Sequence, residues 1–139
     1  MSDSYRDLIV WQKGMALARG IYAATEAFPA REMYGLTNQV RRAAVAIPSD
    51  IAEGKGRISK KEFVQMLSRA RGSCFEVQTQ LELSHDFGFL DDTRSAALSS
   101  DAAEVGRLLN GLITSIRNDI SRIRDGDGSS VDLENDDLS

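Results

Sequence analysis

Apolar side chains recur at intervals of three and four residues along most of the chain, which is the spacing of a helix with one buried face. The recurring positions in the first segment are Leu8, Trp11, Met15, Ala18 and Tyr22. Ser4, three residues before Asp7, is a candidate for a helix capping box, and Pro29 ends the pattern. The sequence therefore predicts a first helix over residues 5–27.

A second helix is predicted from residue 36 to the glycines at 54 and 56, which can end it by adopting positive φ. Its apolar positions are Leu36, Val40, Ala43, Ile47 and Ile51. Pro48 lies inside this pattern. Because proline removes a backbone donor and clashes with the preceding turn, we expect a kink or an opened turn over residues 44–48.

The third predicted helix has the clearest start, with Ser59 as N-cap and Glu62 placed to reach back to it. Ile58 is expected to pack on Phe63 as a hydrophobic staple. The apolar seam that follows runs through Phe63, Leu67, Ala70, Cys74, Val77, Leu81 and Ser84. Gly88 supplies the stop. Since Cys74 falls in the seam, it is expected to be a packed thiol and not a nucleophile or ligand.

A fourth helix is predicted to begin near residue 91 or 92 and to end where an acidic tail begins. Its apolar positions are Leu98, Ala102, Val105, Leu109, Leu112, Ile116, Ile120 and Ile123. Four helices with mostly short connections favour an all-α fold, an antiparallel up-down four-helix bundle over residues 1–124.

The tail, residues 125–139, holds six acidic residues and no basic one, while the chain before it carries a net charge of +2. Only Val131, Leu133 and Leu138 are apolar in the tail, so little burial can offset the entropy lost on ordering. It is expected to be a flexible, solubilising end. The alternative is an acidic mimic of nucleic acid that folds over the basic part of the chain.

The basic part lies between Arg41 and Arg71, where eight basic and three acidic residues give +5 in a chain whose total is −4. An anionic partner, RNA or DNA, is therefore expected to bind here. The candidate nucleic-acid-binding residues are Arg41, Arg42, Lys55, Arg57, Lys60 and Lys61.

Small residues surround these cations, including Ala44 on the second helix and Gly72 on the third, so the two helices are expected to approach closely. Long polar residues stand beside them, and a buried charge persists only when it is paired. Ion pairs are therefore expected from Arg41 or Arg42 to Glu53 or Glu76, and from Arg71 to an acid on a neighbouring helix. The candidate structural or interface network is Gln39, Arg41, Glu53, Arg71 and Glu76.

Nothing in the sequence supports catalysis, a cofactor or a metal site. His85 is the only histidine, and with Glu82 it matches one half of a di-iron motif that needs a second copy. It is expected to interact with the C-terminal end of its helix. No signal peptide is evident, and no apolar stretch approaches the ~20 residues that span a bilayer, so a cytoplasmic protein without a membrane partner is expected.

The second and third helices also resemble a known family. The run LTNQVRRAAVAIPSDIAEG at 36–54, SKKEF at 59–63 and ARGS at 70–73 with Glu76 resemble the four-helix bundle proteins named after open reading frames in 23S rRNA intervening sequences. LIVWQK at 8–13 and Phe28-Pro29 with Glu32 and Tyr34-Gly35-Leu36 add to the likeness, which runs to about residue 90. Two positions depart from the family pattern: Ala46 stands where serine is usual, and Asp50 where asparagine is usual.

The resemblance implies a non-enzymatic bundle that assembles into a homo-oligomeric ring, commonly a pentamer. Relatives among retroelement accessory proteins bind nucleic acid and a reverse transcriptase. An RNA-associated oligomer that uses the basic helix-turn-helix segment is therefore expected. The alternative is a ring that acts as a protein-interaction adaptor without binding nucleic acid. The anion at Asp50 weakens any direct contact of that part of the helix with phosphate.

Overall fold

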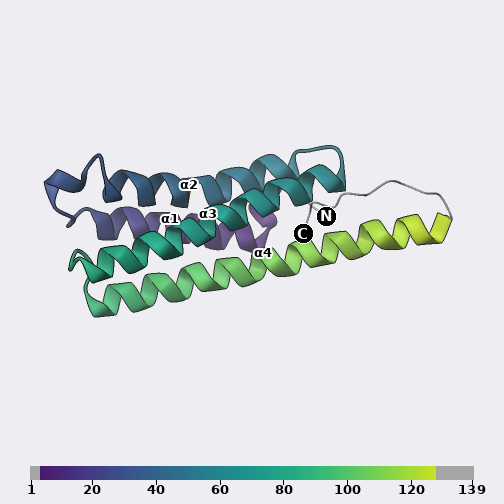
Figure 1. Ribbon diagram of the computed structural model, residues 1–139. Helices are drawn as coiled ribbons and strands as arrows, with labels where there is room; N and C mark the ends of the chain where they lie inside the picture. The colour runs from purple at the N-terminus through teal and green to yellow at the C-terminus, as the bar shows by residue number, and fades with distance from the viewer. Residues whose placement is uncertain (1–3, 128–139) are drawn as a thin grey trace.

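The structure is a computed structural model and describes residues 4–127. Within this range the chain forms a short 3₁₀ turn η1 (Tyr5–Asp7), helix α1 (Ile9–Thr25), a second 3₁₀ turn η2 (Ala30–Glu32), and helices α2 (Leu36–Lys55), α3 (Lys60–Asp86) and α4 (Asp92–Asp127). Each helix packs against the next along the chain, and α1 packs on α4, which closes the bundle. Figure 1 shows the four helices alternating in direction, so the predicted antiparallel four-helix bundle is confirmed.

The first helix begins later than predicted and turns a different face to the core. Leu8 is extended, with φ −75° and ψ 124°, and separates η1 from α1. The predicted seam positions Trp11 and Met15 are only partly buried, and Tyr22 is exposed. Ala18 is buried as predicted, and the rest of the core face is formed by a second set: Val10, Gly14, Leu17, Ile21 and Ala24.

The N-terminal caps confirm part of the sequence interpretation. The Ser59 hydroxyl accepts a hydrogen bond from the backbone N–H of Glu62 at 3.0 Å and so begins α3. The predicted staple is wrong, because Ile58 is fully exposed and does not pack on Phe63. The Ser4 hydroxyl accepts from the N–H of Arg6, one residue short of the predicted Asp7.

Helix α2 continues through Pro48, which is buried against α1. Gly54 lies inside the last turn of α2, and Gly56 follows the helix with φ −82°, so the stop by positive φ predicted for these glycines is wrong. The kink predicted at Pro48 stays a prediction. Gly88 follows α3 with φ +80°, the left-handed conformation that stops the helix as predicted.

Helix α4 is the longest and continues beyond the ends of the other three (Figure 1). It runs through Asp127, three residues past the predicted end of the bundle at residue 124. Ile123, a predicted core position, is 54% exposed because α1, α2 and α3 do not extend over this end of α4 (Figure 1). The rest of the acidic tail, with its predicted flexibility, lies outside the described residues.

Candidate functional site

A polar groove of about 640 Å³ runs between α2 and α3 on the outside of the bundle. This α2–α3 groove is lined by Tyr34, Asn38, Gln39, Arg42, Ala43, Ala46, Ser73, Glu76 and Gln80. It forms because the facing positions Ala43, Ala46 and Ser73 carry little side-chain bulk, while long polar groups stand along its edges. Three of the sequence-predicted residues, Gln39, Arg42 and Glu76, are therefore brought together here.

The charges of the α2–α3 groove have no partners within the bundle. In the part of the chain that the structure describes, neither Arg42 nor Glu76 forms an ion pair. The side-chain oxygen of Gln80 is buried and lacks a hydrogen bond. A buried polar group without a partner costs about 1–3 kcal/mol, so a partner that supplies one would bind favourably.

Arg41 points away from this groove, and the predicted ion pair from it to an acid is wrong. Its Nε donates a hydrogen bond of 2.7 Å to the hydroxyl of Thr25 on α1. Its guanidinium lies over the ring of Tyr22, 4.6 Å from the centroid. Successive residues of a helix point in directions about 100° apart, so Arg41 faces α1 while its neighbour Arg42 faces α3.

The remaining members of the predicted network lie in separate places. Arg71 donates to the side-chain oxygen of Asn110 on α4 at 3.1 Å, so its partner is an amide and not the expected acid. Glu53 pairs with Arg57 one turn later, with 2.5 Å between Nη2 and Oε2. The five residues Gln39, Arg41, Glu53, Arg71 and Glu76 thus form no single network within one chain.

Asp50 lies on α2 and is partly buried. Burial raises the pKa of its carboxyl, Arg69 opposes this by lowering it, and Glu53 raises it further. When the carboxyl is ionised its negative charge repels phosphate, so Asp50 does not favour a phosphate contact at this part of α2.

The turn between α2 and α3 carries four of the predicted nucleic-acid-binding cations. Two of them are already paired with acids: Arg57 with Glu53, and Lys60 with Asp119 on α4, 3.7 Å away. Lys55 and Lys61 form no ion pair with any described residue. The turn is therefore less positive than its sequence indicates.

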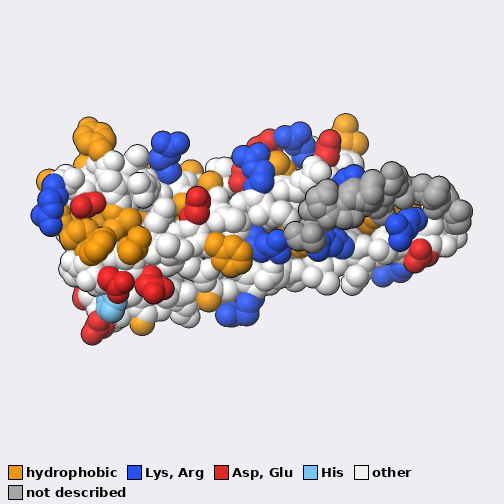
Figure 2. Space-filling model, viewed as in Figure 1, with side chains coloured by type: hydrophobic (Ala, Val, Ile, Leu, Met, Phe, Trp, Pro, Cys, Tyr) orange, Lys and Arg blue, Asp and Glu red, His pale blue; other side chains and the backbone are white. Residues whose placement is uncertain are grey.

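The charged side chains are nonetheless distributed unevenly along the bundle. Figure 2 shows Lys and Arg side chains mainly over the half of the bundle that contains the α2–α3 turn, interleaved with a few acids. Acidic side chains surround the histidine at the opposite end. An anionic partner would therefore approach the turn end of the bundle first.

The groups that could do chemistry are engaged structurally. The Cys74 thiol is buried and donates to the carbonyl of Ala102 at 3.2 Å, and burial raises its pKa. His85 lies in the last turn of α3, where a hydrogen bond of 2.6 Å to Asp92 raises its pKa. No cluster of metal-binding side chains exists within residues 4–127. None of the helices in that range is both long enough and apolar enough to cross a membrane.

A second groove, between α1 and α2, was not expected from the sequence. This α1–α2 groove of about 430 Å³ is lined by Tyr5, Trp11, Met15, Ala18, Arg19, Tyr22, Val45, Pro48, Ser49 and Ala52. The sequence predicts Trp11, Met15 and Tyr22 on the buried face of the first helix, whereas the structure places them at this groove. The overlapping set beginning at Val10 and Gly14 was the signal that could have moved them to the rim.

Comparison with known proteins supports the likeness seen in the sequence. The family model described as "23S rRNA-intervening sequence protein" matches residues 6–111. A solved structure from Bacteroides thetaiotaomicron, described as a protein with unknown function from the S23 ribosomal protein family, has a TM-score of 0.70 and 21% identity. The match covers 76% of this chain and 98% of that one, and it shows a shared fold. No curated protein matches the chain.

Proposed function

Since the chain belongs to the 23S rRNA-intervening sequence protein family, we propose that it is a non-enzymatic, homo-oligomeric bundle that associates with RNA through its α2–α3 face. The observation that carries this proposal is that Arg42, Lys55 and Lys61 have no acidic partner among the described residues. Within the described residues these cations are therefore available to bind an anionic group.

The α2–α3 groove is the proposed contact between neighbouring subunits. Arg42 and Glu76 lie in the same groove with opposite charges, so a neighbouring copy can satisfy both at once. Ion pairs at such an interface fix the relative position of subunits even where they add little affinity. A ring follows when this contact repeats around an axis, and five subunits is the arrangement to expect first.

The proposed RNA contact is made by Lys55 and Lys61 in the α2–α3 turn. Each subunit supplies only these two unpaired turn cations, so binding to one subunit is weak. Repetition around a ring multiplies the number of phosphate contacts without any new kind of contact.

The RNA contact is tested by replacing the unpaired cations and, separately, the paired ones. Lys55→Ala with Lys61→Ala should weaken binding to a structured RNA and reduce the slope of log K against log salt by about two per subunit engaged. Arg57→Ala with Lys60→Ala removes the same charge, but from residues already neutralised by Glu53 and Asp119, and should cost less. Fluorescence anisotropy over a salt series measures both. Equal losses, or none, would reject the assignment to Lys55 and Lys61.

The subunit contact is tested by Arg42→Met, which keeps much of the side-chain length and removes the charge. We expect a lower mass by light scattering while circular dichroism stays unchanged. Arg94→Met, on the exposed first turn of α4, is the control and should leave the mass as it was. A wild-type protein that is monomeric at every concentration would remove the ring from the proposal.

A second candidate is a protein-interaction adaptor. Phe75 on α3 and Phe87, the residue that follows α3, are 58% and 61% exposed, which favours an apolar partner more than a phosphate backbone. This function predicts complexes that survive nuclease treatment and are lost on Phe75→Ser, with Lys55→Ala and Lys61→Ala having no effect.

A further inference from the structure

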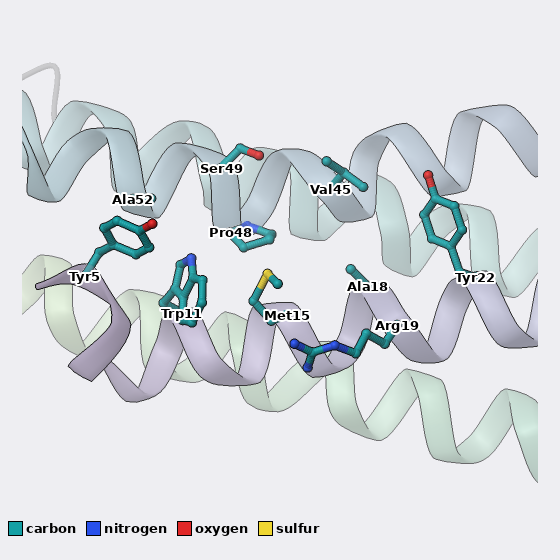
Figure 3. A pocket seen from close by; sticks show the side chains of 10 residues that line it. All are labelled: Tyr5, Trp11, Met15, Ala18, Arg19, Tyr22, Val45, Pro48, Ser49 and Ala52. Atoms are coloured by element: carbon teal, nitrogen blue, oxygen red, sulfur yellow. The ribbon is translucent and has the colours of Figure 1, made fainter.

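The floor of the α1–α2 groove is apolar and open to solvent. Figure 3 shows Trp11 and Met15 of α1 facing Pro48 of α2 across it, with Tyr5 at one end and Tyr22 at the other. Tyr22 and Val45 are 44% and 43% exposed. Exposed apolar side chains that line a concave site favour an apolar occupant.

The rim of the groove is cationic. Arg6 lies over the ring of Tyr5, 5.0 Å from its centroid, and Arg41 lies over Tyr22. The side chain of Arg19 extends along α1 toward Met15 (Figure 3). None of these three arginines forms an ion pair in residues 4–127, and no acidic residue lines the groove. The occupant should therefore combine an apolar side chain with acidic neighbours.

We propose that this occupant is the end of the chain's own acidic C-terminal segment, with Leu138 seated beside Trp11. Leu138 follows the acidic pair Asp136 and Asp137, so it is an apolar side chain with acidic neighbours, as the groove requires. The two carboxylates then lie near Arg6 and Arg19, while the leucine covers the apolar floor.

The length of chain after α4 decides which residue can reach the groove. Leu112 of α4 and Leu8, just before α1, line the same pocket, so they lie at the same height along the bundle axis. From Leu112 to Asp127, α4 continues for fifteen residues, which is about 22 Å along that axis. Returning to Trp11, one turn further on and about one helix diameter across, takes about 29 Å in all. Eleven extended residues place Leu138 at about 36 Å, within range, whereas Leu133 reaches only about 20 Å.

A weak contact is enough to fill the groove when the occupant is tethered. For an effective concentration of about 1 mM, a dissociation constant of about 0.1 mM leaves about nine-tenths of the grooves occupied. The docking is independent of RNA binding, since Lys55 and Lys61 line no part of this groove.

Trp11 is the only tryptophan in the chain, so its fluorescence reports directly on the groove. In the full-length protein, Leu138→Ser should shift Trp11 emission to longer wavelength and raise its quenching by acrylamide. Leu133→Ser is the matched control and should change neither, because residue 133 cannot reach Trp11. Both positions lie outside the described bundle, so neither variant removes a side chain from its core.

A charge exchange tests the rim. Arg19→Glu should mimic Leu138→Ser, and adding Asp136→Lys with Asp137→Lys should restore the protected Trp11. The proposal is overturned if Leu138→Ser leaves the emission and quenching of Trp11 unchanged. It is also overturned if Val45→Glu lowers the mass by light scattering while Leu138→Ser is silent, because the groove then belongs to a second copy of the chain.

Discussion

Gly54 at the end of α2 lies so close to Met66 of α3 that a β-carbon on Gly54 would stand 2.8 Å from the β-carbon of Met66. Cδ1 of Phe63 would be 2.9 Å away. The β-carbon of Met66 is fixed to the backbone, so no change of side-chain rotamer can relieve the contact. The two helices therefore approach here through the absence of a side chain.

Gly54→Ala should accordingly lower the free energy of unfolding by about 1–3 kcal/mol, the usual cost of overpacking a well-packed site. Urea denaturation at fixed protein concentration measures it. Gly72→Ala is the matched control, because a β-carbon there meets nothing within 4 Å. Since Gly72 is exposed inside α3, alanine should stabilise the protein by up to about 1 kcal/mol. A Gly54→Ala protein as stable as the wild type would contradict the close approach.

Asp50→Asn should raise stability at neutral pH and much less near pH 4. Because the native pKa of Asp50 is raised above its ordinary 3.8, the folded state binds the proton more tightly than the unfolded state. Stability therefore falls as pH rises from the ordinary pKa through the raised native one. Asparagine removes this penalty and carries no charge beside Glu53. Unfolding curves at several pH values show it, with Asp101→Asn on the exposed side of α4 expected to change little.

The thiol of Cys74 should be unreactive in the native protein. It is 1% exposed, and burial raises its pKa, so little thiolate forms and reagents cannot reach it. Reaction with Ellman's reagent should proceed only as fast as the bundle opens and become rapid in urea. Fast labelling without denaturant would show that the seam between α3 and α4 opens readily.

His85 should titrate above its ordinary pKa of 6.5, because its hydrogen bond to Asp92 is the largest influence on it. Asp92→Asn should lower the histidine pKa, and Asp86→Asn should lower it less, since Asp86 acts only through its charge. NMR titration of the imidazole measures both. The pair stabilises the fold below pH 6.5, and this contribution is lost as pH rises through the raised native pKa. Equal effects of the two substitutions would contradict a dominant hydrogen bond.

The α2–α3 groove shows how far sequence interpretation reached into the candidate site. Gln39, Arg42 and Glu76 stand beside small seam residues in the sequence, and the structure places all three in one groove. The same pattern predicts a close helix contact at Gly72, yet Gly72 faces solvent. Tyr34, which is 94% exposed at the groove, carried no signal beyond its place in the family pattern.

The partners of the charged residues were harder to predict. Pairing each arginine with an acid is sound as electrostatics, but it ignores the neutral acceptors on neighbouring helices. Arg41 donates a hydrogen bond to Thr25, sixteen residues away in the sequence, and Arg71 donates one to Asn110, thirty-nine residues away. Which acceptor lies within reach depends on how helices cross, and residue type alone does not contain that information.

The sequence by itself determined the four helices, the cap at Ser59 and the stop at Gly88. These features depend on side-chain periodicity and on hydrogen bonds between residues a few positions apart, so a short stretch of sequence is enough to predict them. Only the tertiary structure decided which of two overlapping apolar sets of α1 faces the core, and that Gly54, not Gly72, brings α2 against α3. The direction of a helix face is fixed by the helices packed around it, because each side chain must fit the space that the others leave.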